Sequence, residues 1–180
     1  MMKMKKWMKE VAVMVVMAVL LLGGITFWQI QQDKYQNTLE QRGAKLSRIY
    51  EGPVEISSEI ITDDWIVSET WASGQHGFAV FTSEEDNGNY QWKYWERVPA
   101  DGLHIKMFLA NGQTYHILLS GEMQMDYAEV ALVDAGYVQH EETVSFEGRG
   151  IAVLQVPEWL HSWSPSATWY DTSGNIYSTD

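Results

Sequence analysis

The chain has 180 residues and no cysteine, and its 24 acidic and 12 basic side chains give a net charge of −12. This length suffices for one domain with a sizeable core, and disulfide bonds are excluded. Residues 1–50 carry eight Lys/Arg and three Asp/Glu, a net of +5, whereas residues 51–180 carry four Lys/Arg and twenty-one Asp/Glu, a net of −17. A domain this acidic repels phosphate, so nucleic acid is not expected as a partner.

The first predicted element is a transmembrane helix at residues 7–28. Its uncharged run from Val11 to Trp28 would rise about 27 Å as a helix, close to the roughly 30 Å hydrocarbon core of a bilayer. Lysines precede the run, which predicts a cytoplasmic basic tail at residues 1–6, and Trp7 and Trp28 bracket the run as interfacial aromatic residues do. We therefore expect a single-pass protein of the cell membrane, with a cytoplasmic N-terminus and an extracellular C-terminal domain. A cleaved signal peptide is the alternative, but no A-x-A cleavage site follows the run.

Residues 29–50 are polar and helix-prone, and they predict a helical stalk that lifts the outer domain off the membrane. A heptad can be laid on this segment, which leaves a dimerisation zipper open as an alternative. Gln32 and Arg42 interrupt the apolar seam, however, and Gly43 weakens the helix.

After Gly52-Pro53 the apolar pattern changes to period two, which predicts an acidic extracytoplasmic β domain at residues 53–180. Short strands separated by turn residues are typical of an all-β fold, here an antiparallel β-sandwich-like domain of which an Ig-like arrangement is one form. Asn111-Gly112 predicts a type I′ hairpin, because both central residues of that turn need positive φ. Segment 57–64 is compatible with a strand or a short helix. The expected strands lie at 64–67, 77–81, 90–94, 104–110, 113–119, 127–133, 142–146, 150–156, 169–170 and 176–177.

The sequence contains no recognisable catalytic or metal-binding motif. The acidic loop at residues 83–89 fails the spacing of a calcium-binding EF-hand. His104 and His116 flank the predicted hairpin but are three positions out of register, so a zinc pair is not expected. Ser73 and His76 lie close in sequence, but a catalytic triad is assembled by the fold and not by adjacency. We therefore expect no enzyme and no cofactor.

Trp159, Trp163 and Trp169 form the candidate ligand or partner patch. Exposed tryptophans in this Pro-bounded region would stack on sugar faces or form an apolar surface for a protein partner. The alternative is that these rings cap the open end of the sandwich.

The order of features from Gly77 onward resembles that of a known class. GFAVF is followed by an NG-containing loop, YQWKYW, a hairpin ending in YHILLSG, AEVALV, GRGIAVLQVP and the tail ATWYDTSGNIYS. This order resembles uncharacterised small membrane-anchored extracytoplasmic β-domain proteins of Bacillus-like Gram-positive bacteria, over about residues 77–178. The resemblance implies one membrane helix and one β domain, and it implies no catalytic or binding residue.

Together these features predict a non-enzymatic accessory, sensory or protein-docking module at the cell envelope, with an envelope protein as its partner. This hypothesis expects an exposed aromatic patch and no deep polar cleft. The first alternative is a cell-wall carbohydrate-binding module, which expects two coplanar tryptophan rings spaced for sugar units. The second is an undetected envelope hydrolase, which expects a cleft where a serine or carboxylate meets a histidine with a shifted pKa.

Overall fold

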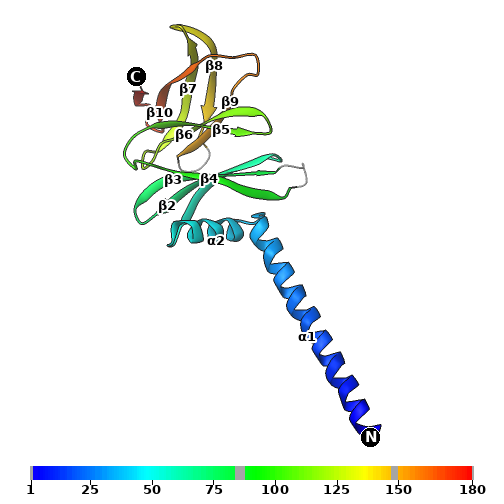
Figure 1. Cartoon of the computed structure of the whole chain (residues 1–180). Helices are drawn as coiled ribbons and strands as arrows, with labels where there is room; N and C mark the ends of the chain where they lie inside the picture. The colour runs from blue at the N-terminus through cyan, green and yellow to red at the C-terminus, as the bar shows by residue number, and fades with distance from the viewer. Residues whose placement is uncertain (1, 84–87, 147–149, 180) are drawn as a thin grey trace. The chain divides into compact units, whose positions relative to one another are not determined.

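The computed structural model describes residues 2–83, 88–146 and 150–179, and it divides into two compact units, Met1–Tyr35 and Gln36–Asp180. The first unit is helix α1, Met2–Lys34 (Figure 1). The side chains of residues 13–27 in this helix are exposed and mostly apolar. Among the described residues, no helix is long and apolar enough to cross a membrane. The side chains of residues 2–10, 12 and 28–33, which include Trp7 and Trp28, lie outside the description.

Helix α2, Leu39–Tyr50, begins the second unit. Thr38 caps its first turn, because the Thr38 hydroxyl accepts from the Gln41 amide at 3.2 Å and the Gln41 side chain accepts from the Thr38 amide at 3.0 Å. The predicted stalk at residues 29–50 is therefore not one helix, since α1 ends at Lys34 and a new helix starts after the cap. Leu46 of α2 is buried in an apolar cluster of the second unit, so α2 is part of the folded domain.

Eleven strands are present in the described residues, and every pair is antiparallel, which confirms the all-β prediction. They form three sheets. The helix-side sheet has the order β1 (Glu55–Ile61), β2 (Trp65–Ala72), β3 (Gln75–Ser83), β4 (Tyr90–Val98). The central sheet has the order β5 (His104–Ala110), β6 (Gln113–Leu119), β9 (Ile151–Gln155). The outer sheet has the order β11 (Ile176–Thr179), β10 (Ser164–Asp171), β7 (Met125–Asp134), β8 (Tyr137–Ser145).

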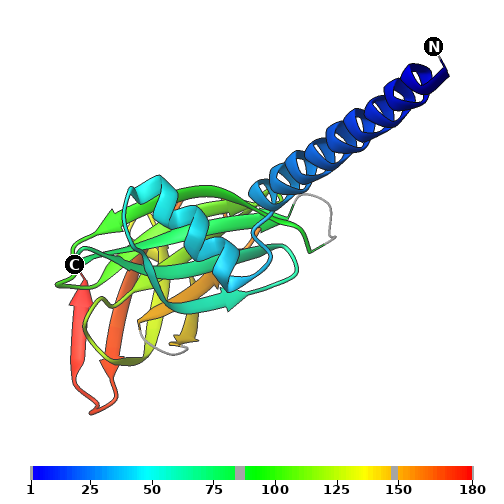
Figure 2. The ribbon, with the colours of Figure 1, turned by 90° about the horizontal axis from the view of Figure 1, so that it is seen from below.

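The three sheets lie in layers, with the central sheet between the other two (Figure 1). Consecutive residues of strand β6 account for this layering. Ile117 packs in the cluster shared with the helix-side sheet, and Leu118 packs in the cluster shared with the outer sheet. Both faces of the central sheet therefore carry buried apolar residues, although Met107 and Leu109 on the edge strand β5 are more than half exposed. A third cluster, which includes Leu46 and Phe81, joins α2 to the helix-side sheet, and Figure 2 shows the helix lying across those strands.

Three hairpins in the described residues have two-residue turns in which both residues have positive φ. Asn111 (φ 49°) and Gly112 (φ 78°) join β5 to β6, as the sequence predicts. In the resulting register His104 is opposite Leu119 and His116 is opposite Met107, which confirms that the two histidines are not paired. The other two hairpins, at residues 73–74 between β2 and β3 and at residues 135–136 between β7 and β8, are not among the predicted ones. Segment 57–64 falls mostly in strand β1, and residues 84–87 of the predicted acidic loop lie outside the described residues.

Candidate functional site

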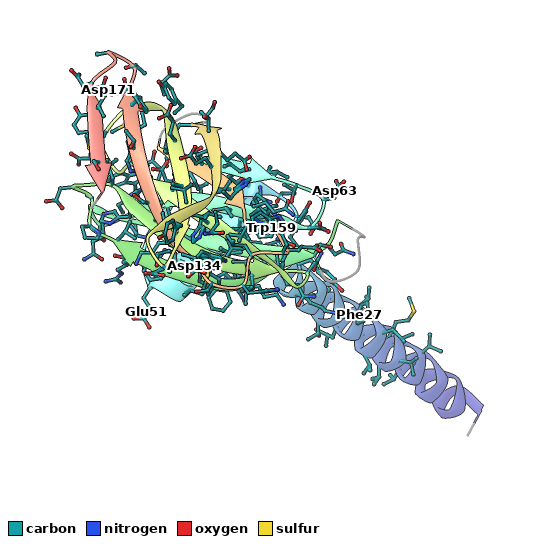
Figure 3. The ribbon with its side chains drawn as sticks, turned by 90° about the horizontal axis from the view of Figure 1, so that it is seen from above. Phe27, Glu51, Asp63, Asp134, Trp159 and Asp171 are labelled. Atoms are coloured by element: carbon teal, nitrogen blue, oxygen red, sulfur yellow. The ribbon has the colours of Figure 1, made fainter. Side chains whose placement is uncertain are left out.

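An open groove of about 950 Å³ lies at one end of the central sheet. Three segments that are distant in sequence form its walls: Asp64 from the turn before β2, residues 111–115 from the tip of the β5–β6 hairpin, and residues 155–158 and 160–163 from the end of β9 and the loop after it. In Figure 3 the labelled Trp159 and Asp63 lie toward the same end of the domain, away from Asp171.

Hydrogen bonds between these segments fix the shape of the groove. The Asn111 side-chain amide donates to the Asp64 carboxylate at 2.9 Å, which ties the hairpin tip to the turn before β2. The Val156 amide donates to the Thr114 carbonyl at 2.9 Å, and the Gln113 side-chain amide donates to the Val156 carbonyl. The groove is therefore largely preformed, as ligand sites commonly are.

The charge of the groove is negative. Its lining includes the carboxylates of Asp64 and Glu158, and among the described residues of the lining there is no lysine or arginine. The lining also contains His161, and the other polar side chains of its described residues are mostly amides and hydroxyls. On a domain whose sequence carries a net of −17 after residue 50, this groove attracts cations and repels anions.

The three tryptophans of the candidate patch have different environments. Trp163 lines the groove, and its ring packs edge-on against His116 with the ring centroids 4.7 Å apart. Trp159 belongs to the same loop and is 59% exposed. Trp169 is fully buried, because its position on β10 faces the central sheet, and it packs against Phe146. The structure thus removes Trp169 from the predicted surface patch and leaves Trp159 and Trp163.

His116 is buried beneath Trp163, behind the wall of the groove. Burial lowers the pKa of its imidazole below the ordinary value of 6.5, and the contact of its Nδ1 with the Lys106 carbonyl at 3.4 Å opposes this effect. His116 is therefore neutral at physiological pH and supports the wall as an uncharged ring.

A second polar cluster lies between the helix-side and central sheets. The Glu69 Oε1 and His76 Nε2 atoms are 2.9 Å apart, with both side chains at most 1% exposed, and Ser57 donates to Glu69 Oε2 at 2.7 Å. The Trp71 ring stacks on His76 at 4.6 Å. This burial closes the pair off from a substrate. Sequence reasoning missed it, although the Ser-Gly turn at residues 73–74 is a hairpin signal that would have aligned Trp71 with His76.

The groove is polar, which differs from the docking hypothesis as first stated, since that hypothesis expected no deep polar cleft. The catalytic pairing expected of a hydrolase is not observed for Ser162, because its hydroxyl donates to Asp134 at 3.2 Å. Among the described residues, no group of three or more His, Asp or Glu side chains comes together as a metal site would require.

No protein-family model matches the chain, and no curated protein or solved structure is significantly similar to it. The resemblance to Gram-positive membrane-anchored β-domain proteins therefore stays a prediction. The proposed function therefore rests on the groove and its negative charge.

Proposed function

We propose that this chain is a membrane-anchored, extracytoplasmic, non-enzymatic docking domain whose groove binds a cationic polypeptide segment of an envelope partner. The observation that carries the proposal is the open groove whose described lining residues include two carboxylates, Asp64 and Glu158, and neither lysine nor arginine. Complementary charge steers such a partner to the groove and selects against anionic competitors.

The membrane anchor of the proposal rests on α1. The sequence gives it an uncharged run of eighteen residues after a lysine-rich start, and its described side chains at residues 13–27 are exposed and mostly apolar. Under the positive-inside rule the lysines stay in the cytoplasm, so the β-sandwich-like domain is outside.

A glycan ligand is the second candidate, and one observation favours it. Trp163 lines the groove together with the side-chain amides of Gln113 and Gln155, and an aromatic face beside amides suits a neutral sugar. The negative charge gives no advantage for a neutral sugar, and it repels anionic wall polymers. We therefore rank the cationic polypeptide first.

Peptide binding to the full-length chain in lipid nanodiscs tests the proposal. We expect a fluorescent lysine-rich peptide to bind and a glutamate-rich peptide not to bind. The double variant Asp64→Asn/Glu158→Gln should weaken binding at least about tenfold.

The matched control is Glu129→Gln/Glu141→Gln, which removes the same charge from a separate recess on the outer sheet. If both double variants lose the same peptide affinity, net charge alone attracts the peptide and the groove is not its site, which would contradict the proposal. Binding of a muropeptide or chitooligosaccharide, but of no peptide, would move the glycan to first place.

The orientation has a direct test because the chain has no cysteine. A membrane-impermeant maleimide added to intact cells should label the Ser173→Cys variant and spare the Met4→Cys variant. The opposite pattern would contradict the proposed topology.

A further inference from the structure

We propose that the partner segment binds as an added antiparallel β-strand along the free edge of β9. This inference rests on the proposed function and specifies how the groove holds its partner. Strand addition to an exposed sheet edge is a general mode of peptide recognition, in which main-chain hydrogen bonds give affinity and alternate side chains give specificity.

Strand β9 is an edge of the central sheet, because the strand order β5-β6-β9 gives it one neighbour, β6. The Val156 amide donates to the Thr114 carbonyl, and the Ser120 amide donates to the Gly150 carbonyl, both at 2.9 Å. In an antiparallel ladder, hydrogen-bonded and non-hydrogen-bonded pairs alternate. The intervening residues Val153 and Gln155 therefore direct their backbone N–H and C=O groups away from β6.

This edge opens into a second cavity, of about 330 Å³, which Val153 and Gln155 both line. Tyr115 and Gln155 line the groove as well, so the cavity continues the groove along β9. A peptide that lies in the groove can therefore extend beside the free edge of the strand.

The two sides of this cavity have different chemistry. Ile60 of β1 and Trp65 of β2 give it an apolar side, and Val153 packs toward the same cluster. Glu142 of β8 supplies a carboxylate, with His140 at 3.2 Å from it. Side chains of a strand alternate between faces. The fitting partner is an extended segment that alternates apolar and cationic residues.

The register predicts which amides of the partner matter. Residues opposite each other in an antiparallel pair have side chains on the same face, so an apolar partner residue is opposite Val153. Val153 directs its backbone groups outward, so the amide of that apolar residue forms the hydrogen bond. The amides of the cationic residues then point away from β9.

The test uses full-length chain in nanodiscs and the labelled peptide Lys-Val-Lys-Val-Lys-Val-Lys. One derivative carries N-methylvaline and another carries N-methyllysine, so both keep the charge but lose different amide hydrogens. We expect methylation at valine to weaken binding at least about tenfold and methylation at lysine to have a much smaller effect.

Two chain variants test the same contact from the other side. Gln155→Pro removes an outward N–H from an exposed residue and should weaken binding of the unmodified peptide. Leu109→Pro is the control on β5, the opposite edge, where Met107 already directs its carbonyl outward to the Tyr94 hydroxyl. Circular dichroism melting checks that both variants fold. If either variant is unfolded, the methylated peptides alone test strand addition at β9.

Equal binding of both methylated peptides would overturn strand addition. If the Asp64→Asn/Glu158→Gln variant still lost binding in that case, the proposed function would stand on charge alone. Failure of the unmodified peptide to bind the parent chain would overturn both proposals.

Discussion

Arg42 and Glu59 form a bidentate ion pair between α2 and β1, with Nη2 2.6 Å from Oε2 and Nε 2.7 Å from Oε1. Both side chains are nearly buried, at 3% and 11% exposure. Arg42 also donates to the carbonyls of Gln36 and Asn37, which follow directly after the first unit. Arg42, one of the two residues that interrupt the heptad of the predicted stalk, thus links α2 to β1 and to the start of the second unit.

Replacing Arg42 with alanine should lower the free energy of unfolding by about 3–5 kcal/mol, because it leaves the nearly buried Glu59 carboxylate without its charged partner, with the Ser68 hydroxyl still donating to it. Urea denaturation measures the loss. The control is Lys106→Ala, which breaks an exposed pair with Glu96 and should cost less than about 1 kcal/mol. Similar losses of unfolding free energy in the two variants would contradict the conclusion that the Arg42–Glu59 pair holds α2 on the domain.

Gly150 and Gly174 both have positive φ, at 85° and 82°, but differ in packing. A Cβ at Gly150 would lie 2.8 Å from Ser120 Oγ and 3.0 Å from Glu69 Oε1, whereas a Cβ at Gly174 would meet no atom within 4 Å. Gly174→Ala should therefore cost only the backbone strain, about 1–2 kcal/mol. Gly150→Ala should cost about 1–3 kcal/mol more, from overpacking. Equal melting temperatures would show that the site around Glu69 is less tightly packed than described.

The tryptophans should separate into core and surface. Trp169→Ala should lower the free energy of unfolding by about 3–5 kcal/mol, because its ring is fully buried. Trp159→Ala should change it by no more than about 0.5 kcal/mol. Chemical denaturation of the two variants distinguishes them, and a small loss at Trp169 would restore it to the surface patch.

His116 should make stability depend on pH. Since burial lowers its pKa in the folded chain, the unfolded chain binds a proton first as the pH falls below about 6.5. The free energy of unfolding should therefore fall with decreasing pH below that value, with His116 contributing at most about 1.4 kcal/mol per pH unit. In urea denaturation, the free energy of unfolding should change less between pH 7.5 and pH 5 for His116→Gln than for the parent. The control is His104→Gln, and an unchanged difference in His116→Gln would contradict the assignment.

Local chemistry accounts for the parts of the fold that the sequence predicts well. Asn111-Gly112 determines its own turn through positive φ, and the period-two pattern after Gly52-Pro53 identifies an antiparallel β fold. The helix prediction at residues 29–50 fails at its centre, because the Thr38 cap starts a new helix there. Which face of α2 is buried depends on Glu59, a partner seventeen residues away in the chain.

The candidate site was predictable only in part. Loop composition directs attention to residues 159–163, of which Trp163 lines the groove and Trp159 does not. Trp169 does not belong with them, because its strand position points into the core. The groove itself joins Asp64, the hairpin tip and the loop after β9, and no spacing within the sequence links these segments. The free edge of β9 likewise depends on the strand order of the central sheet.

Hydrogen exchange of the full-length chain in nanodiscs, with and without the peptide Lys-Val-Lys-Val-Lys-Val-Lys, tests the central claim most directly. If the groove is the docking site, the peptide should slow amide exchange in segments 111–115 and 151–163. Slowing confined to the outer sheet, at residues 127–145 and 164–171, would contradict the assignment of the groove.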